Sequence, residues 1–123
     1  MTQGIRVQVK SEYSPTRSAP KDGHWFFLYT ITITNESDQA ATLVHRHWVI
    51  TNARGEVSEV QGPGVVGEQP RLDPGATFEY TSACPLDTSF GTLAGTYSFE
   101  TEDGAAFDAE VPTFSLAMPY AIN

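Results

Sequence analysis

The sequence predicts an all-β protein, an antiparallel immunoglobulin-like sandwich of seven or eight strands. Apolar and polar residues alternate in short segments, and no segment shows the period of an amphipathic helix. Ten glycines and eight prolines fall largely between these segments, where turns belong. With 123 residues, 40% of them apolar, we expect a single domain over residues 1–123 that buries its own core.

The first half of the chain carries four predicted strands. Ile5, Val7 and Val9 alternate with polar residues, as in a half-buried strand. Residues 14–23 are polar, contain two prolines, and predict a loop. Aromatic and β-branched residues then favour a pleated surface. Strands are expected over residues 24–35, 41–52 and 57–61, with a turn at 52–55.

The second half continues the pattern after a glycine-rich segment, residues 62–75. A tight turn is expected over residues 72–75, because proline presets φ and glycine accepts a positive φ. Phe78 and Tyr80 alternate with polar residues in the next strand. A loop over residues 85–91 and a strand over 92–101 follow.

The last hairpin can be assigned a register. A three-residue loop, residues 102–104, pairs Phe99 with Phe107 and Tyr97 with Ala109, which makes one face apolar. A two-residue turn would instead pair these aromatic residues with acidic ones. The preferred register leaves three carboxylates on the outer face: Glu100, Asp108 and Glu110.

Gly62, Gly64 and Gly67 have the GxGxxG spacing of a pyrophosphate-binding loop. That function requires a helix after the loop, and Pro70 and Pro74 prevent one from forming. We therefore expect the glycines to serve the backbone conformation, with at least one at positive φ. A backbone nest that binds an anion without a helix remains the alternative.

The same loop is the preferred candidate for contact with a partner. Val65 and Val66 are expected to be exposed apolar residues between the glycines, and Arg71 is the one basic residue nearby. The candidate binding residues are Gly62, Gly64, Val65, Val66, Gly67 and Arg71. The loops at one end of a sandwich are common docking surfaces.

The formal net charge of −8 is unevenly placed. Residues 1–61 carry six acidic and six basic side chains, whereas residues 62–123 carry nine acidic residues and only Arg71. Such a half repels phosphate backbones, so no nucleic-acid partner is expected. The C-terminal carboxylates are expected to form a solvated face that binds divalent cations weakly at most. They are Glu100, Glu102, Asp103, Asp108 and Glu110.

No metal or catalytic centre is predicted. His45 and His47 share a strand face, but a zinc site needs a third ligand and only His24 remains. Cys84 is the single cysteine and is expected to be a small core or rim residue without a neighbouring base. No apolar run resembles a signal peptide or a membrane span, so we expect a cytoplasmic location and no membrane partner.

Four segments of the chain match those of a known family, in the same order. They are SEYSP, FFLYTITITNES, RHWVITNARGEV and the long run VQGPGVVGEQPRLDPGATFEYTSACPLDTSFGTLAGTYSF. On these segments the chain resembles the ApaG family over nearly its whole length. It implies a fibronectin-III-like sandwich and an association with cobalt and magnesium efflux. ApaG-like domains in eukaryotic F-box proteins imply a binding role. The family's glycine motif falls on Gly62, Gly64 and Gly67.

Two functions remain open at this point. The first is a non-catalytic module that binds another protein and needs no cofactor, which is expected because no nucleophile has an adjacent base. The second is a sensor or small enzyme that uses the glycine loop to bind a phosphate compound or a divalent cation. A pairable strand edge or an exposed apolar patch would favour the first function.

Overall fold

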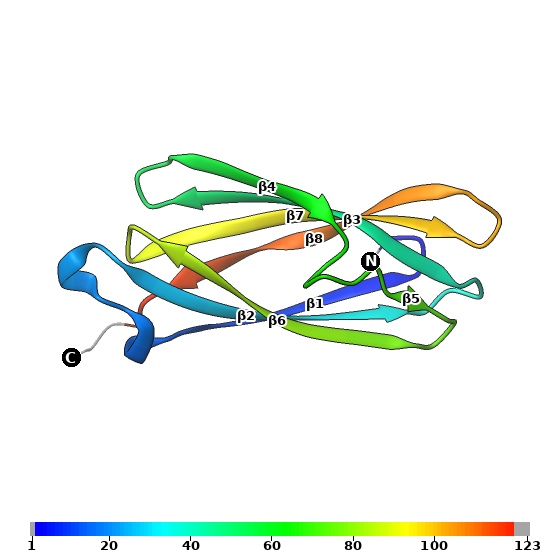
Figure 1. The fold of residues 1–123 in the computed structure, drawn as a ribbon, viewed down its shortest axis with the longest axis horizontal. Helices are drawn as coiled ribbons and strands as arrows, with labels where there is room; N and C mark the ends of the chain where they lie inside the picture. The colour runs from blue at the N-terminus through cyan, green and yellow to red at the C-terminus, as the bar shows by residue number, and fades with distance from the viewer. Residues whose placement is uncertain (1, 120–123) are drawn as a thin grey trace.

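Two antiparallel sheets pack face to face in the computed structural model, which describes residues 2–119 (Figure 1). The strands are β1 (Ile5–Tyr13), β2 (Trp25–Asn35), β3 (Ala41–Asn52), β4 (Val57–Pro63), β5 (Arg71–Leu72), β6 (Thr77–Leu86), β7 (Phe90–Thr101) and β8 (Ala106–Ala117). One sheet has the order β1-β2-β6, the other has the order β4-β3-β7-β8, and β5 pairs with β3. The predicted all-β sandwich is confirmed.

The core lies between the two sheets and comes from alternate residues of nearly every strand. In β2, every second side chain from Phe27 to Asn35 is buried, so the period-2 pattern of the sequence translates directly into an inner face. The largest fully buried side chains include Tyr97, Phe27, Phe99, Ile31 and Leu43. Aromatic residues of this size contribute much of the apolar area that a small domain buries.

The last hairpin has the register that the sequence predicts. Phe99 pairs with Phe107 and Tyr97 with Ala109, and the two phenyl rings stack 5.5 Å apart. The amide of Thr101 donates to the carbonyl of Ala105 across the loop. Gly104 has φ +85°, the left-handed conformation that the loop needs.

Several elements differ from the prediction. β4 ends at Pro63 instead of residue 61, and β7 begins at Phe90 instead of residue 92. Residues 14–23 contain two short 3-10 turns, η1 (Pro15–Arg17) and η2 (Pro20–Asp22). β6 continues through Pro85, which the sequence pattern places in a loop. An edge strand tolerates proline where the missing N–H would face away from its neighbour, and β6 is an edge strand. The short strand β5 was not predicted, because two residues are too few to show a pattern.

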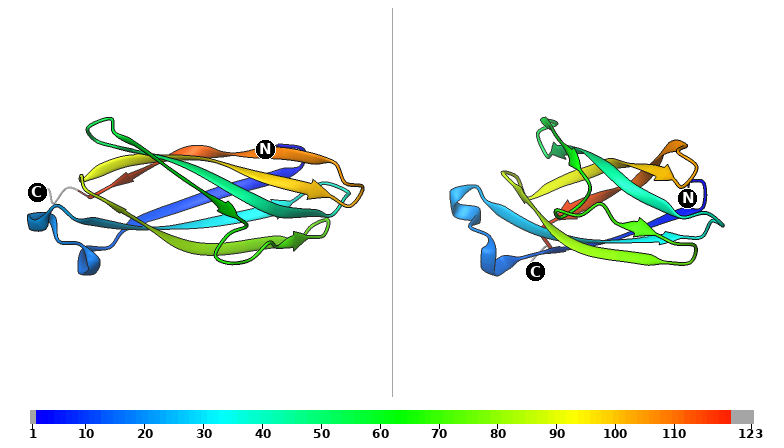
Figure 2. Two further views of the ribbon diagram at one scale, coloured as in Figure 1. Left: turned by 45° about the horizontal axis from the view of Figure 1, so that its top comes forward. Right: turned by 45° about the vertical axis from the view of Figure 1, so that its right-hand side comes forward.

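The two long sides of the sandwich differ, and the difference positions the candidate site. On the closed side, β1 and β8 lie against each other. On the open side, a groove separates β4 from β6. Figure 2 shows β4 and the loop after it running obliquely across this side, from the layer of β3 toward the layer of β6.

Candidate functional site

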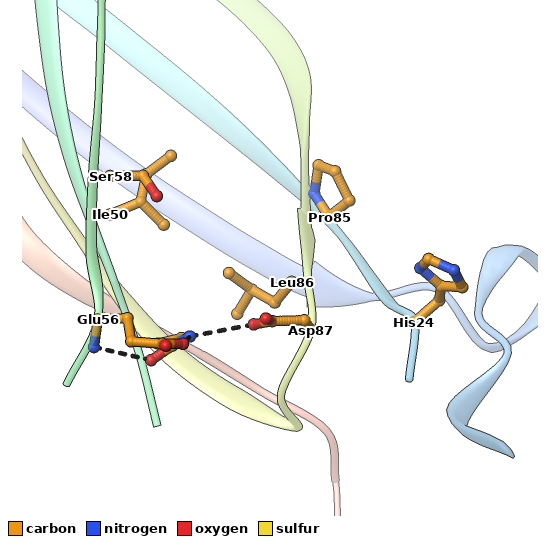
Figure 3. Close-up of a pocket in the computed structure, with 8 residues that line it drawn as sticks. His24, Ile50, Glu56, Ser58, Pro85, Leu86 and Asp87 are labelled. Atoms are coloured by element: carbon orange, nitrogen blue, oxygen red, sulfur yellow. Dashed lines mark hydrogen bonds between the residues drawn. The ribbon is translucent and has the colours of Figure 1, made fainter. Parts of the chain in front are cut away.

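The groove of the open side widens into a pocket of about 500 Å³ near the end of β6. Its lining residues come from both sheets and from the turn between β3 and β4: His24, Ile50, Asn52, Glu56, Ser58, Pro85, Leu86 and Asp87. In Figure 3, Glu56 and Asp87 face each other across the lower part of this pocket. Four residues here form a network that we call the polar clamp: Asn52, Arg54, Glu56 and Asp87.

The polar clamp joins the two sheets at one end of the groove. The Asn52 amide donates to Glu56 Oε1 at 2.7 Å and to Asp87 Oδ1 at 3.1 Å. The Arg54 guanidinium reaches the same two carboxylates at 2.8 and 2.6 Å. The Asn52 hydrogen bonds, followed by Arg54, lower the pKa of both carboxyls. Since each carboxylate already has partners, the clamp is a structural feature more than a reactive one.

Arg46 occupies the opposite end of the groove, beneath the glycine loop. Its Nη1 donates to the carbonyls of Pro63 and Gly64, each at 3.1 Å. A Cβ on Gly62 would lie 3.0 Å from Nη1 and 3.2 Å from the guanidinium carbon. The first glycine of the motif therefore leaves room for the Arg46 side chain.

The other two positions of the motif require glycine for different reasons. Gly64 has φ +59°, and a Cβ there would lie 1.9 Å from the carbonyl oxygen of Glu68. Gly67 has φ +81° with no atom near its Cβ position, so only its backbone conformation needs glycine. The prediction that at least one of these glycines has positive φ is confirmed.

Three amides of the glycine loop already have partners. Gly64 N donates to the carbonyl of Val44, at a bulge in β3, while Val65 and Glu68 exchange two backbone hydrogen bonds. No helix follows, because β5 comes next. A phosphate cradle needs several free amides that converge on one point, and three amides of this loop already donate to backbone carbonyls, two of them within the loop.

Val65 corrects one expectation about the loop. Its side chain is fully buried in the core, so the prediction that it is exposed is wrong, whereas Val66 is 51% exposed. The paired bonds to Glu68 turn the Val65 side chain inward. Arg71 is exposed and pairs with Asp73 and Glu102.

A smaller cavity of about 160 Å³ lies under Arg46, and we call it the Arg46 cavity. Its walls are Tyr29, Arg46, Trp48, Ile50, Val60, Ser82, Ala83, Cys84 and Leu93. Beside it, the hydroxyls of Tyr80 and Tyr97 hydrogen bond to each other between the sheets. Burial raises the pKa of both phenols, and it also raises that of Tyr29, which Ser82 partly opposes by hydrogen bonding.

Cys84 is buried, as expected for a core cysteine. Burial raises the pKa of its thiol to about 11. A nucleophilic cysteine needs the opposite shift, because the thiolate is the reactive form. The arrangement around Cys84 therefore disfavours thiol chemistry at neutral pH.

The histidines and the acidic face do not converge. His47 Nε2 lies 2.7 Å from Glu59 Oε1, and His45 lies 3.4 Å from Gln61 Oε1, both on the outer face of the β3–β4 pair. The carboxylates of Glu100, Asp108 and Glu110 are on exposed residues. Within residues 2–119, no three His, Cys, Asp or Glu side chains are grouped as a metal site requires.

Exposed apolar residues gather on β4 and the glycine loop. Val57 is 60% exposed, Val60 is 41% exposed and Val66 is 51% exposed. All but one of the residues of β4 are exposed, a larger share than in any other long strand. β4 pairs only with β3, so its other edge carries unpaired backbone groups. Among residues 2–119, the other large apolar residues that are exposed are Phe90 and Met118.

Sequence reasoning missed Arg46 as a site residue. The available signal was its spacing of two from Trp48, which puts both side chains on one face of β3. The bulge at Val44 hid that signal, because it shifts the alternation between Leu43 and His45. An arginine on the inner face of a sandwich is unusual enough to mark a site.

The comparisons with known proteins agree with this fold. Residues 15–101 match the model of the ApaG domain. The Protein ApaG of Bdellovibrio bacteriovorus is 52% identical over 97% of this chain and 94% of its own length. That of Azoarcus is 51% identical over 99% and 96%. A crystal structure of a Bordetella pertussis protein described as ApaA superposes with a TM-score of 0.91 at 47% identity, covering 94% of each chain.

One further finding concerns membranes. In the part of the chain that the structure describes, no helix is long and apolar enough to cross a bilayer.

Proposed function

The chain belongs to the ApaG family, and from this premise we propose that it is a non-catalytic module that docks to another protein. The observation that carries the proposal is the character of β4. This strand is a sheet edge with free backbone groups, and it leads into a loop that adds another exposed valine. We call Val57, Val60, Val66 and the free edge of β4 the docking surface.

Strand edges and exposed apolar residues favour protein partners. A free edge can pair with an extended segment of another chain, and neighbouring apolar side chains add affinity and select the partner. Val57 and Val60 point to opposite faces of β4, so they would flank a strand added at its edge. Arg71 is a weaker candidate than expected, since Asp73 and Glu102 already neutralise it.

The alternative function, a sensor or small enzyme for phosphate compounds or divalent cations, has less support. Val65 and Glu68 bond to each other, and Gly64 bonds to Val44, so these three amides do not point to a phosphate. His45 and His47 already contact Gln61 and Glu59.

The proposal also includes the type of sandwich, the location of the protein and its cellular role. The division of strands into β1-β2-β6 and β4-β3-β7-β8 supports a fibronectin-III-like sandwich. We propose a cytoplasmic location and a part in cobalt and magnesium efflux exerted through the docked partner. The resemblance to the ApaG family supports both.

The experiment compares capture of native cytosolic proteins by three immobilised forms. Val57→Asp/Val66→Asp places two charges on the docking surface without entering the core. The matched control is Phe90→Asp, an exposed apolar residue on β7, beyond β3 from β4. We expect one protein to be captured by the wild type and the control and lost with the double variant, while both variants keep the melting temperature within a few degrees.

Purified partner then has to bind the wild-type chain directly, as measured by calorimetry. A captured protein that binds the double variant equally well would show that docking uses another surface. Turnover of a phosphate compound by highly purified protein, lost in Gly64→Ala, would contradict the non-catalytic role.

A further inference from the structure

Arg46 differs from the three arginines that form ion pairs in the described residues. Those three lie at the surface beside carboxylates: Arg6 with Glu36, Arg54 with Glu56 and Asp87, and Arg71 with Asp73 and Glu102. Arg46 faces the inside of the sandwich, and among residues 2–119 it forms no ion pair. Although the chain has fifteen acidic side chains, no ion pair to this cation occurs in the part of the chain that the structure describes.

The guanidinium is held in place but not fully used. Its contacts within the described residues run from Nη1 to the carbonyls of Pro63 and Gly64. Gly62 lies against the same group and would have to shift it if it carried a side chain. The remaining donors, Nε and Nη2, are free to bind an acceptor in the Arg46 cavity.

The cavity combines this charge with polar and apolar walls. Tyr29 and Ser82 supply hydroxyls. A phenol is protonated at neutral pH, and burial raises the pKa of Tyr29 further, so its hydroxyl can donate. Trp48, Ile50 and Leu93 supply apolar surface. Such a site matches a ligand with one anionic group joined to a compact apolar group.

We propose that the Arg46 cavity binds a small carboxylic acid in its ionised form, with the carboxylate on Arg46 and the Tyr29 hydroxyl and the apolar part against Trp48 and Leu93. Size sets the class of ligand, because a cavity of about 150 Å³ can hold a six-carbon ring. Charge selects a carboxylate over a phosphate dianion. One guanidinium balances one negative charge, and a second charge would remain unpaired in an apolar cavity.

This site does not depend on the docking surface. The ligand lies between the sheets, whereas a docked protein would contact the free edge of β4. Val60 belongs to both sites, so the docking experiment changes Val57 and Val66 and leaves Val60 unchanged.

The test is a proton–nitrogen NMR titration with 3-methylbutanoate, followed at the indole N–H of Trp48. The neutral isostere 3-methylbutanamide is the matched ligand control. We expect saturation by the acid with a dissociation constant of about 1 mM or tighter, and no saturation by the amide in the same range. Arg46→Gln should weaken binding about tenfold or more, because a charge-assisted hydrogen bond is lost. The exposed Arg17→Gln changes the net charge equally and should have no effect.

A second variant keeps the proposal testable if Arg46→Gln disturbs the glycine loop. Val60→Trp fills the mouth of the cavity from β4 and leaves Arg46 in place, and it should also abolish saturation. Equal binding of acid and amide, tighter binding of inorganic phosphate, or unchanged binding in Val60→Trp would overturn the proposal. Titration with a tripeptide ending in valine distinguishes two sources of the carboxylate. Tighter binding of the tripeptide than of 3-methylbutanoate supports a peptide C-terminus as the ligand, and weaker binding supports a free metabolite.

Discussion

The two long sides of the sandwich hold the two sheets together in different ways. On the closed side, β1 and β8 bring the sheets together through apolar packing, with Leu116 fully buried and Val7 and Val9 against the core. On the open side, β4 and β6 stay apart. The polar clamp joins the two sheets at one end of the groove, whereas at the other end Arg46 bonds to the glycine loop within the sheet of β3 and β4.

The difference teaches where stability and binding capacity reside in this fold. Apolar burial excludes water and gives the closed side most of its free energy. Polar bridges contribute less, because each replaces hydrogen bonds to water, but they hold a groove open and fix its geometry. We therefore expect a strong gradient of mutational sensitivity from the closed side to the open side.

The sharpest comparison sets Leu116→Ala on β8 against Val60→Ala on β4. Leu116 is completely buried, and its truncation should lower the free energy of unfolding by about 2–5 kcal/mol through lost burial and a cavity. Val60 is 41% exposed at the edge of the groove, and its truncation should cost less than about 0.5 kcal/mol. Urea denaturation measures both. Equal costs would remove the distinction between the sides.

The glycine loop is the most sensitive part of the open side. Gly64→Ala should destabilise by about 2 kcal/mol or more, since its Cβ would meet the Glu68 carbonyl in addition to the unfavourable φ. Gly67→Ala is the matched control, with a similar φ but no steric contact, and should cost about 1 kcal/mol. Thermal melting in the same buffer ranks the two. If Gly67→Ala proved the more harmful, the steric explanation would fail.

The polar clamp should show its contribution as a dependence on pH. The pKa of Asp87 is lowered in the folded state, mainly by the Asn52 hydrogen bond and then by Arg54. Its stabilisation is therefore complete above the ordinary carboxyl pKa of about 3.9 and is lost as pH falls through the lowered folded value.

The measurement compares urea midpoints of wild type and Asp87→Asn at pH 7 and at about pH 3. We expect the variant to be less stable at pH 7 and the gap to shrink at low pH. Glu110→Gln is the control, an exposed carboxylate on β8 with no side-chain partner among the described residues, and its midpoint should follow the wild type at both pH values. A gap for Asp87→Asn that widens in acid would contradict the clamp.

Cys84 gives the smallest effect and reports on access from the open side. With its pKa raised to about 11, the thiol should react with iodoacetamide at pH 8 at least about a hundredfold more slowly than in urea-unfolded protein. Mass spectrometry of timed samples gives both rates. Rapid labelling of the folded chain would mean that the reagent reaches Cys84 from the open side and that the pKa of its thiol is not raised.

Local patterns predicted the strands well and the groove poorly. The sequence predicts the register of the β7–β8 hairpin correctly, because only one register places Phe99 opposite Phe107 on an apolar face and Gly104 in the loop. Pro85 misled the prediction of β6, since a proline ends a strand in the interior of a sheet but not at an edge. Whether a strand lies at an edge depends on the other strands.

The sequence by itself determined the all-β class, most strand positions and the need for a positive φ at one or more of the glycines of the loop. These follow from a period of two and from backbone sterics, which act between neighbours in the chain. Tertiary structure alone decided that Val65 points into the core, that Gly62 makes room for Arg46, and that Arg46 meets Tyr29 and Trp48 in one cavity. The physical reason is that these contacts join separate strands, and their geometry arises only when a bulge at Val44 and the divergence of β4 from β6 set the distance between the sheets.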